Sequence, residues 1–162
     1  MHNIQIRLAN ESDQEAIDAI NRCAWAGSIT THELLERRHG PIDGRTWDEH
    51  IVEAVSDNLA QPDVTAFVAV REGQVVGYAT AQIQPTEEGA DLGVVGYNAV
   101  HPDHQGHGIG TALVKQVLSF LKAEGARVLA VWTLEADEPA RHMYEKLGFE
   151  KLARFVYYSV DA

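Results

Sequence analysis

The stretch AVHPDHQGHGIGTALVKQVLSFLKAEG, residues 99–125, contains the end of a strand, a glycine-rich turn and a helix in direct succession. Three alternating glycines precede a run of apolar residues at helical spacing: Ile109, Leu113, Val117, Phe120 and Leu121. The free N–H groups and the dipole of a helix N-terminus attract anions, and glycines let a ligand approach the backbone. The stretch therefore predicts a phosphate-binding or pyrophosphate-binding turn, with a plain turn as the alternative.

The glycine spacing distinguishes between the known phosphate-binding motifs. A Walker loop requires Lys-Ser or Lys-Thr after the glycines, and neither pair follows here. A dinucleotide fingerprint, G-x-G-x-x-G, would place glycine where this chain has Thr111 or Leu113. The pattern that remains is Q-x-x-G-x-G at residues 105–110, preceded by Val-His-Pro at residues 100–102.

This pattern resembles the acyl-CoA-binding motif of the GCN5-related N-acetyltransferase (GNAT) family. A second segment, DEPARHMYEKLGF at residues 137–149, resembles the second signature of that family, N-x-x-A-x-x-x-Y-x-x-x-G-F, with Asp137 where Asn is more usual. Asp137 is an expected N-cap, Pro139 suits the first helical turn, and Gly148 is an expected terminator.

The resemblance implies acetyl-CoA as the acyl donor, with its pyrophosphate on the amides of residues 105–111 and its pantetheine arm between two splayed parallel strands. The cofactor-binding residues that it implies are Ala99, Val100, Gln105, Gly106, His107, Gly108, Ile109, Gly110, Thr111, Asp137 and Ala140. It also implies that Tyr144 lies near the thioester sulfur, where a phenol could protonate the departing thiolate. Spacing alone favours a core tyrosine instead, packed on Met143 and Leu147. The joint presence of both motifs favours the acid.

The general base is harder to place, because many relatives carry a Glu on the strand before the glycine turn and residues 96–99 of this chain are Gly-Tyr-Asn-Ala. Glu135, His101, Glu33 or a water chain are the hypotheses for this role. Asn98 interrupts an apolar strand and fits a β-bulge there, or a bond to a neighbouring loop.

The histidines and the cysteine predict no metal site. His101, His104 and His107 are three residues apart, but a loop with glycines and a proline does not hold that spacing on one face. Cys23 is the only cysteine, which we expect to be a small buried residue, and nothing near it resembles an activated nucleophile. Acetyl transfer should therefore be direct.

A net charge of −11 argues against nucleic acid or an anionic membrane as a partner. The first residues form no targeting signal and no run is long enough to span a membrane, so a cytoplasmic protein is expected. The excess of acidic residues also suggests a halophilic source as a hypothesis. Unfolding midpoints measured from low to molar KCl would test it, and no gain in stability with salt would refute it.

The whole chain predicts one α/β domain, residues 1–162, with helices on both faces of a mixed, mostly antiparallel sheet of about six or seven strands. Strands are expected at residues 4–8, 64–70, 74–84, 90–100, 128–134 and 154–160, with turns at residues 72–73 and 85–89. Before residue 60, capping boxes at Ser12/Glu15 and Thr46/Glu49 should open two helices, with a polar segment at residues 27–45 between them. Strand 128–134 should lie inside the sheet, parallel to strand 90–100, and strand 154–160 could pair the edges of two subunits in a homodimer.

The expected function is transfer of an acetyl group to a primary amine of a small molecule, peptide or protein. The resemblance places one wall of the acceptor pocket in the helical region after the first strand. A CoA-binding sensor without turnover is the alternative, because the acid is missing.

Overall fold

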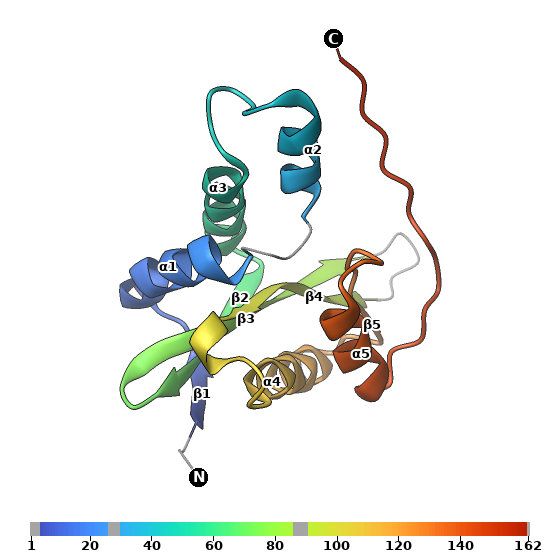
Figure 1. Cartoon of the computed structure of the whole chain (residues 1–162). Helices are drawn as coiled ribbons and strands as arrows, with labels where there is room; N and C mark the ends of the chain where they lie inside the picture. The colour runs from blue at the N-terminus through green and yellow to red at the C-terminus, as the bar shows by residue number, and fades with distance from the viewer. Residues whose placement is uncertain (1–3, 26–29, 86–90, 162) are drawn as a thin grey trace.

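The computed structural model describes residues 4–25, 30–85 and 91–161. Its sheet has five strands in the order β1-β2-β3-β4-β5 (Figure 1). They are β1 (Ile4–Leu8), β2 (Val64–Arg71), β3 (Gln74–Pro85), β4 (Asp91–Val100) and β5 (Val128–Ala130). The first four form an antiparallel meander, and β5 runs parallel to β4, as the sequence predicts.

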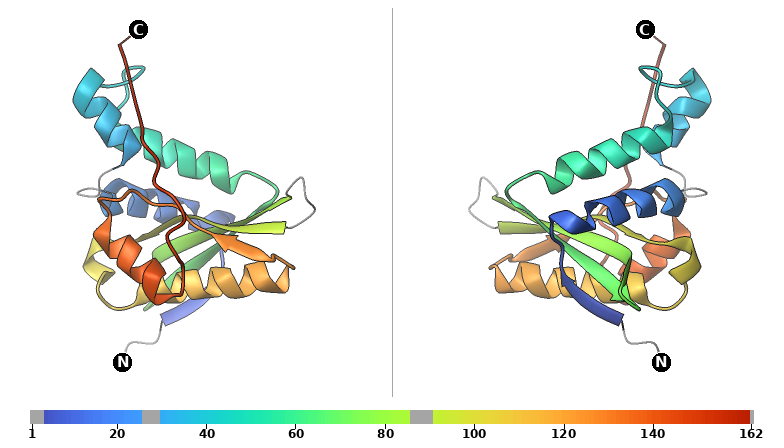
Figure 2. Two further views of the ribbon diagram at one scale, coloured as in Figure 1. Left: turned by 90° about the vertical axis from the view of Figure 1, so that its right-hand side faces the viewer. Right: turned by 90° about the vertical axis from the view of Figure 1, so that its left-hand side faces the viewer.

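Helices cover both faces of this sheet (Figure 2). They are α1 (Gln14–Ala24), α2 (Thr31–His39), α3 (Trp47–Leu59), α4 (Ile109–Ala123) and α5 (Glu138–Lys146). α1 and α3 lie on one face, α4 lies on the other with α5 beside it, and α2 stands beyond α3. Short 3₁₀ turns at Glu11–Asp13 and Pro102–His104 precede α1 and α4.

Each face of the sheet has its own apolar core. On the α4 side, Ile109, Leu113, Val117 and Leu121 are buried at the spacing read from the sequence, and Tyr144 of α5 joins them. On the other side, Ile17, Ile20 and Val55 of α1 and α3 pack on Val68 and Tyr78 of the sheet. The two helical stripes thus bury the inward-facing residues of the same central strands.

Several local predictions are confirmed. Glu72 and Gly73 have positive φ values of 52° and 79° in the turn between β2 and β3. Thr46 and Glu49 form the capping box of α3, and the polar segment before it contains α2. The expected turn at residues 85–89 falls almost entirely outside the described residues.

The predicted position of the first capping box is wrong by two residues. Asn10 and Asp13 form it, and α1 begins at Gln14 rather than after Ser12. The cause is Asp13, which is buried and receives hydrogen bonds of 2.7 Å from both terminal nitrogens of Arg7 on β1. Cys23 is also only partly buried, with its thiol 3.2 Å from the Ala19 carbonyl oxygen.

The number of strands is the main correction to the predicted fold. Residues 154–160 form no strand pairing within the described part of the chain, so the described sheet has five strands and not six or seven. The predicted strand 128–134 pairs only over Val128–Ala130, and it lies at the edge of the described sheet instead of inside it. Among the described residues, no helix is both long and apolar enough to cross a membrane.

Candidate functional site

The turn between β4 and α4 presents a row of free main-chain amides. Gly106 and Gly108 have φ values of 76° and 77°, which let the chain reverse sharply before α4 begins at Ile109. In the described structure, the N–H groups of residues 106–111 donate to no protein atom, and the first helical bond into the turn runs from Ala112 to Gly108. We call residues 106–111 the free-amide turn. Such a row at a helix N-terminus favours an anionic ligand.

Gln105 does not belong to that row. Its main-chain N–H already donates to the Pro102 carbonyl oxygen at 3.2 Å, whereas the sequence reading included its amide. Its side-chain amide donates to the Val100 carbonyl oxygen at 3.0 Å, which ties the turn to the end of β4. His107 lies against the same segment, with Nδ1 2.7 Å from the Gln105 carbonyl oxygen. Gln105 and His107 therefore shape the turn.

The free-amide turn is open above the two positive-φ glycines. A Cβ atom built on Gly106 or Gly108 would meet no heavy atom within 4 Å. A Cβ on Gly110 would lie 3.6 Å from the Met143 sulfur and 3.7 Å from a Val100 methyl. α5 and the end of β4 therefore pack against one flank of the turn, while the other flank is accessible.

β4 and β5 separate after three residue pairs. Pairing runs from Leu92–Val128 to Val94–Ala130, although β4 itself continues to Val100. Opposite β3, Ala81 pairs with Val95 and Ala79 with Asn98, so β4 has one extra residue there. The predicted bulge next to Asn98 is confirmed, and the parallel pair is splayed beyond it.

Asn98 and Tyr144 meet in this splayed region. The Asn98 side-chain N–H₂ donates to the Tyr144 hydroxyl at 3.1 Å and to the Gly96 carbonyl oxygen at 3.1 Å. Tyr144 is 7% exposed and its ring packs edge-on against Phe149, with the centroids 5.8 Å apart. Burial raises the pKa of Tyr144, and the bond from Asn98 opposes that rise. The phenol is therefore protonated at neutral pH.

The N-terminus of α5 is fixed by Asp137. Its Oδ1 accepts from the Ala140 main-chain N–H at 3.2 Å, and its Oδ2 accepts from the Thr133 hydroxyl at 3.3 Å. The predicted N-cap is confirmed, and Gly148, with a φ of 91°, ends the helix as predicted. Ala140 faces the core between the two ends, so that α5 presents Tyr144 to the sheet.

The three side chains considered as a general base lie in different environments. Glu135 accepts from Lys151 at 2.7 Å, and this bond lowers its pKa, which makes it a weaker base. His101 follows β4 and its Nδ1 accepts from the Asp103 N–H at 3.3 Å. Glu33 lies on α2 and pairs with Arg37. Within the described residues, no hydrogen bond joins any of the three to Tyr144 or Asn98.

Comparison with known proteins identifies the family. A profile of the acetyltransferase (GNAT) family matches residues 29–149. The chain belongs to the GNAT family. Among curated relatives, it is 30% identical over 146 residues to the mycothiol acetyltransferase of Thermobispora bispora, covering 86% of this chain and 43% of that protein. It is 29% identical to the Rhodococcus jostii enzyme of the same name, covering 97% of this chain and 48% of that protein.

The chain thus spans less than half the length of these two curated relatives. A solved structure of the aminoglycoside N-acetyltransferase AAC(6')-Iy in complex with CoA has the same fold, with a TM-score of 0.72. The match covers 100% of this chain and 97% of that one at 18% identity. At this identity, the likeness supports the GNAT fold and leaves the substrate open.

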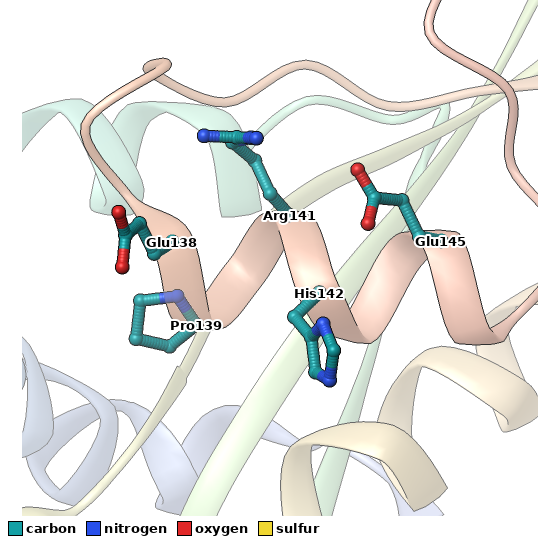
Figure 3. Close-up of a pocket in the computed structure, with 5 residues that line it drawn as sticks. All are labelled: Glu138, Pro139, Arg141, His142 and Glu145. Carbon is teal, nitrogen blue, oxygen red and sulfur yellow. The ribbon is translucent and has the colours of Figure 1, made fainter.

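Two hollows lie near α5 in this GNAT chain. The larger, about 420 Å³, lies on the outer face of α5, where His142 points toward α4 and Arg141 points the opposite way (Figure 3). Its lining includes none of the cofactor-binding or catalytic residues that the family resemblance implies. The second, about 200 Å³, lies where β5 ends and is lined by residues 132–135, 149–155, Arg141, Tyr144 and Glu145. We call this second hollow the edge groove.

Sequence reasoning missed the bond between Asn98 and Tyr144. The sequence placed Asn98 in a bulge or in a bond to a neighbouring loop, whereas its side chain faces α5 and donates to the Tyr144 hydroxyl. Its position between Tyr97 and Ala99, which pack toward α1, could have indicated this by strand alternation. The histidines at 101, 104 and 107 have protein contacts, and the described residues contain no group of three metal-ligating side chains.

Proposed function

We propose that this chain transfers an acetyl group from acetyl-CoA to a primary amine. The observation that carries the proposal is the free-amide turn beside the splayed end of β4, because one element could bind a diphosphate while the other receives an extended arm. Membership of the GNAT family and the CoA-bound structural neighbour support the same donor.

The residues present fit CoA. The open space above Gly106 and Gly108 would admit a diphosphate to main-chain amides that have no protein acceptor. Val100, Ala99 and Ala140 would line the pantetheine arm, while Asp137 would hold α5 in place. Acetyl-CoA would supply a thioester carbonyl and a thiolate leaving group whose conjugate acid has a pKa of about 8.5.

Tyr144 is the proposed acid. Its hydroxyl oxygen accepts from Asn98, so its own hydrogen is free to point to another acceptor, which in the complex would be the leaving sulfur. The raised pKa keeps that hydrogen on the phenol until a base develops nearby. Asn98 would then be a positioning residue, because it holds the hydroxyl oxygen without competing for the hydrogen.

Deprotonation of the acceptor amine is assigned to water. The pKa of Glu135 is lowered by Lys151, and Glu33 is paired with Arg37. Holding the amine against the thioester could supply much of the acceleration without a dedicated carboxylate. The net charge of −11 favours cationic amines as acceptors, and the relatives named for mycothiol and aminoglycosides point to small molecules first.

Thiol release from acetyl-CoA tests the proposal. The panel would contain an aminoglycoside, small primary amines and peptides with a free N-terminus, each followed with a thiol-reactive dye. Release that depends on one class of amine would support the proposal. CoA binding without release on any acceptor would favour the sensor function, which the absence of an acid beside Asn98 motivates.

A further inference from the structure

The edge groove and the splayed strands meet at Tyr144. Pairing between β4 and β5 ends at Ala130, and the lining of the groove begins at Trp132, two residues later. Tyr144 lines the groove, and its hydroxyl accepts from Asn98 of β4 at 3.1 Å. A molecule in the groove would therefore lie next to the side chain that we propose as the acid of acetyl transfer.

The walls of the groove are rich in apolar and aromatic side chains. Those that line it are Trp132, Leu134, Tyr144, Phe149, Leu152 and Phe155. Tyr144 is buried, whereas Trp132, Leu152 and Phe155 are 66%, 93% and 90% exposed, so the groove opens to solvent. Exposed apolar side chains gathered around a hollow indicate a ligand that covers them.

The groove has room for about one ring. Its volume is about 200 Å³. An apolar cavity of roughly 150 Å³ is enough to bind benzene, whereas pockets for drug-sized ligands have about 300–1,000 Å³. A phenyl ring or a short alkyl chain would fit, and an aminoglycoside with several sugar rings would not enter whole.

The charged side chains around the groove balance one another. Three acidic and three basic residues line it: Glu135, Glu145, Glu150, Arg141, Lys151 and Arg154. Glu135 already pairs with Lys151 at 2.7 Å and with Arg154 at 3.4 Å. In the described structure, Glu145 and Glu150 pair with no cationic group. The groove therefore lacks the large negative excess of the whole chain and would attract a single ammonium group more readily than hold a polycation.

Given the proposed acetyl transfer, we propose that the edge groove binds the apolar arm of the acceptor, so that the substrates are monoamines with one aromatic ring or a short alkyl chain. None of the residues assigned to CoA lines the groove, so donor and acceptor would occupy separate sites. The amine nitrogen would form the C–N bond as the C–S bond of the thioester breaks. The amine proton would pass to water, and Tyr144 would supply a proton to the thiolate.

Two amines of similar pKa test this specificity in the thiol assay. 2-Phenylethylamine carries a ring where ethanolamine has a hydroxyl. With rates corrected for the fraction of unprotonated amine, we expect kcat/KM to be roughly 10-fold to 100-fold higher for 2-phenylethylamine, the effect of burying one phenyl ring.

Exposed side chains of the groove allow variants that spare the core. Trp132→Ala should reduce the preference for 2-phenylethylamine by about tenfold, because Trp132 would lose its contact with the ring. Leu152→Ala should reduce it several-fold. Leu8→Ala, the same change at an exposed leucine of β1 on the opposite edge of the described sheet, should leave it unchanged.

An NMR titration separates this inference from the proposed function. When 2-phenylethylamine is added to the isotope-labelled chain, with and without saturating CoA, the indole N–H signal of Trp132 should shift. Loss of that signal in Trp132→Ala assigns it. The shift should occur even if the chain releases no thiol, because binding requires no turnover. An unmoved signal together with thiol release on another amine would overturn the inference and leave the proposed function intact.

Three kinetic results would also overturn it. Equal corrected kcat/KM for the two amines would show that no apolar arm is recognised. A preference that neither Trp132→Ala nor Leu152→Ala reduces would place the arm elsewhere. If hexanoyl-CoA raises the rate on ethanolamine and Trp132→Ala removes that gain, the groove holds the acyl chain of the donor instead.

Discussion

Gly108 and Gly125 offer a matched pair for testing the free-amide turn. They flank α4 with φ values of 77° and 94°, and a Cβ at either position meets nothing within 4 Å. An L-residue in this conformation costs roughly 1–2 kcal/mol. Gly108→Ala and Gly125→Ala should therefore destabilise the fold by similar amounts, lowering the melting temperature by about 2–8 °C for a domain of this size.

Only Gly108→Ala should weaken CoA binding. Gly108 lies within the row of amides at residues 106–111, and relief of the strain at its φ turns neighbouring N–H groups away from a common anion. Loss of one hydrogen bond to a charged group costs about 1.5–3 kcal/mol, which corresponds to a 10-fold to 150-fold rise in the dissociation constant. Gly125, at the opposite end of the helix, should leave CoA affinity unchanged.

Isothermal titration with CoA and with pantetheine separates the diphosphate from the rest of the ligand. The Gly108→Ala loss should appear with CoA and be largely absent with pantetheine, which carries no diphosphate. Equal CoA affinity in the two variants would refute the placement of the diphosphate on residues 106–111. An equal loss for both ligands would show that the substitution deforms the splayed strands instead.

Three further predictions follow from single contacts. Tyr144→Phe should lower turnover by roughly tenfold to a thousandfold with CoA affinity unchanged, and unchanged turnover in the thiol assay would make this residue structural. Asn98→Asp should lower turnover more than Asn98→Ala, because a carboxylate at 3.1 Å would accept the phenol hydrogen; the reverse order would contradict the positioning role. Asp13→Asn should cost about 1–2 kcal/mol in urea unfolding at pH 7, through loss of the bonds from Arg7. Since the pKa of Asp13 is lowered in the folded state, its stabilisation is complete above about pH 5 and disappears as pH falls through the folded value, so the two proteins should converge in acid.

The parts of the fold that the sequence predicted depend on local chemistry. Some features depend only on residues a few positions apart, namely the positive-φ glycines, the cap at Asp137 and the capping box at Thr46. They can therefore be recognised in the sequence without the tertiary structure. The apolar stripe of α4 is likewise a property of the helix itself. These signals placed the free-amide turn and α5 correctly in the chain.

The errors come from contacts between distant residues. Arg7 of β1 holds Asp13 at the N-terminus of α1 through a hydrogen bond. A capping pattern read from neighbouring residues cannot show this contact. Residues 131–134 have the apolar composition of a strand, but pairing stops at Ala130 because the bulge in β4 turns the neighbouring backbone away. Residues 154–160 show the same limit, because a strand-like composition indicates the ability to pair and not the presence of a partner strand.

The amide side chain at position 98 also affects which groups can act as acid and as base in the proposed site. Asn98 donates two hydrogen bonds at once, one to the bulge carbonyl of Gly96 and one to the Tyr144 hydroxyl, and a carboxylate could donate neither. Asn98 is therefore suited to orient an acid, and it cannot itself take a proton from the amine. With Glu135 held by Lys151 at a lowered pKa, the proposed route is loss of the acceptor's proton to solvent. The acceptor's own pKa, more than any side chain of this protein, should then set the pH at which transfer begins.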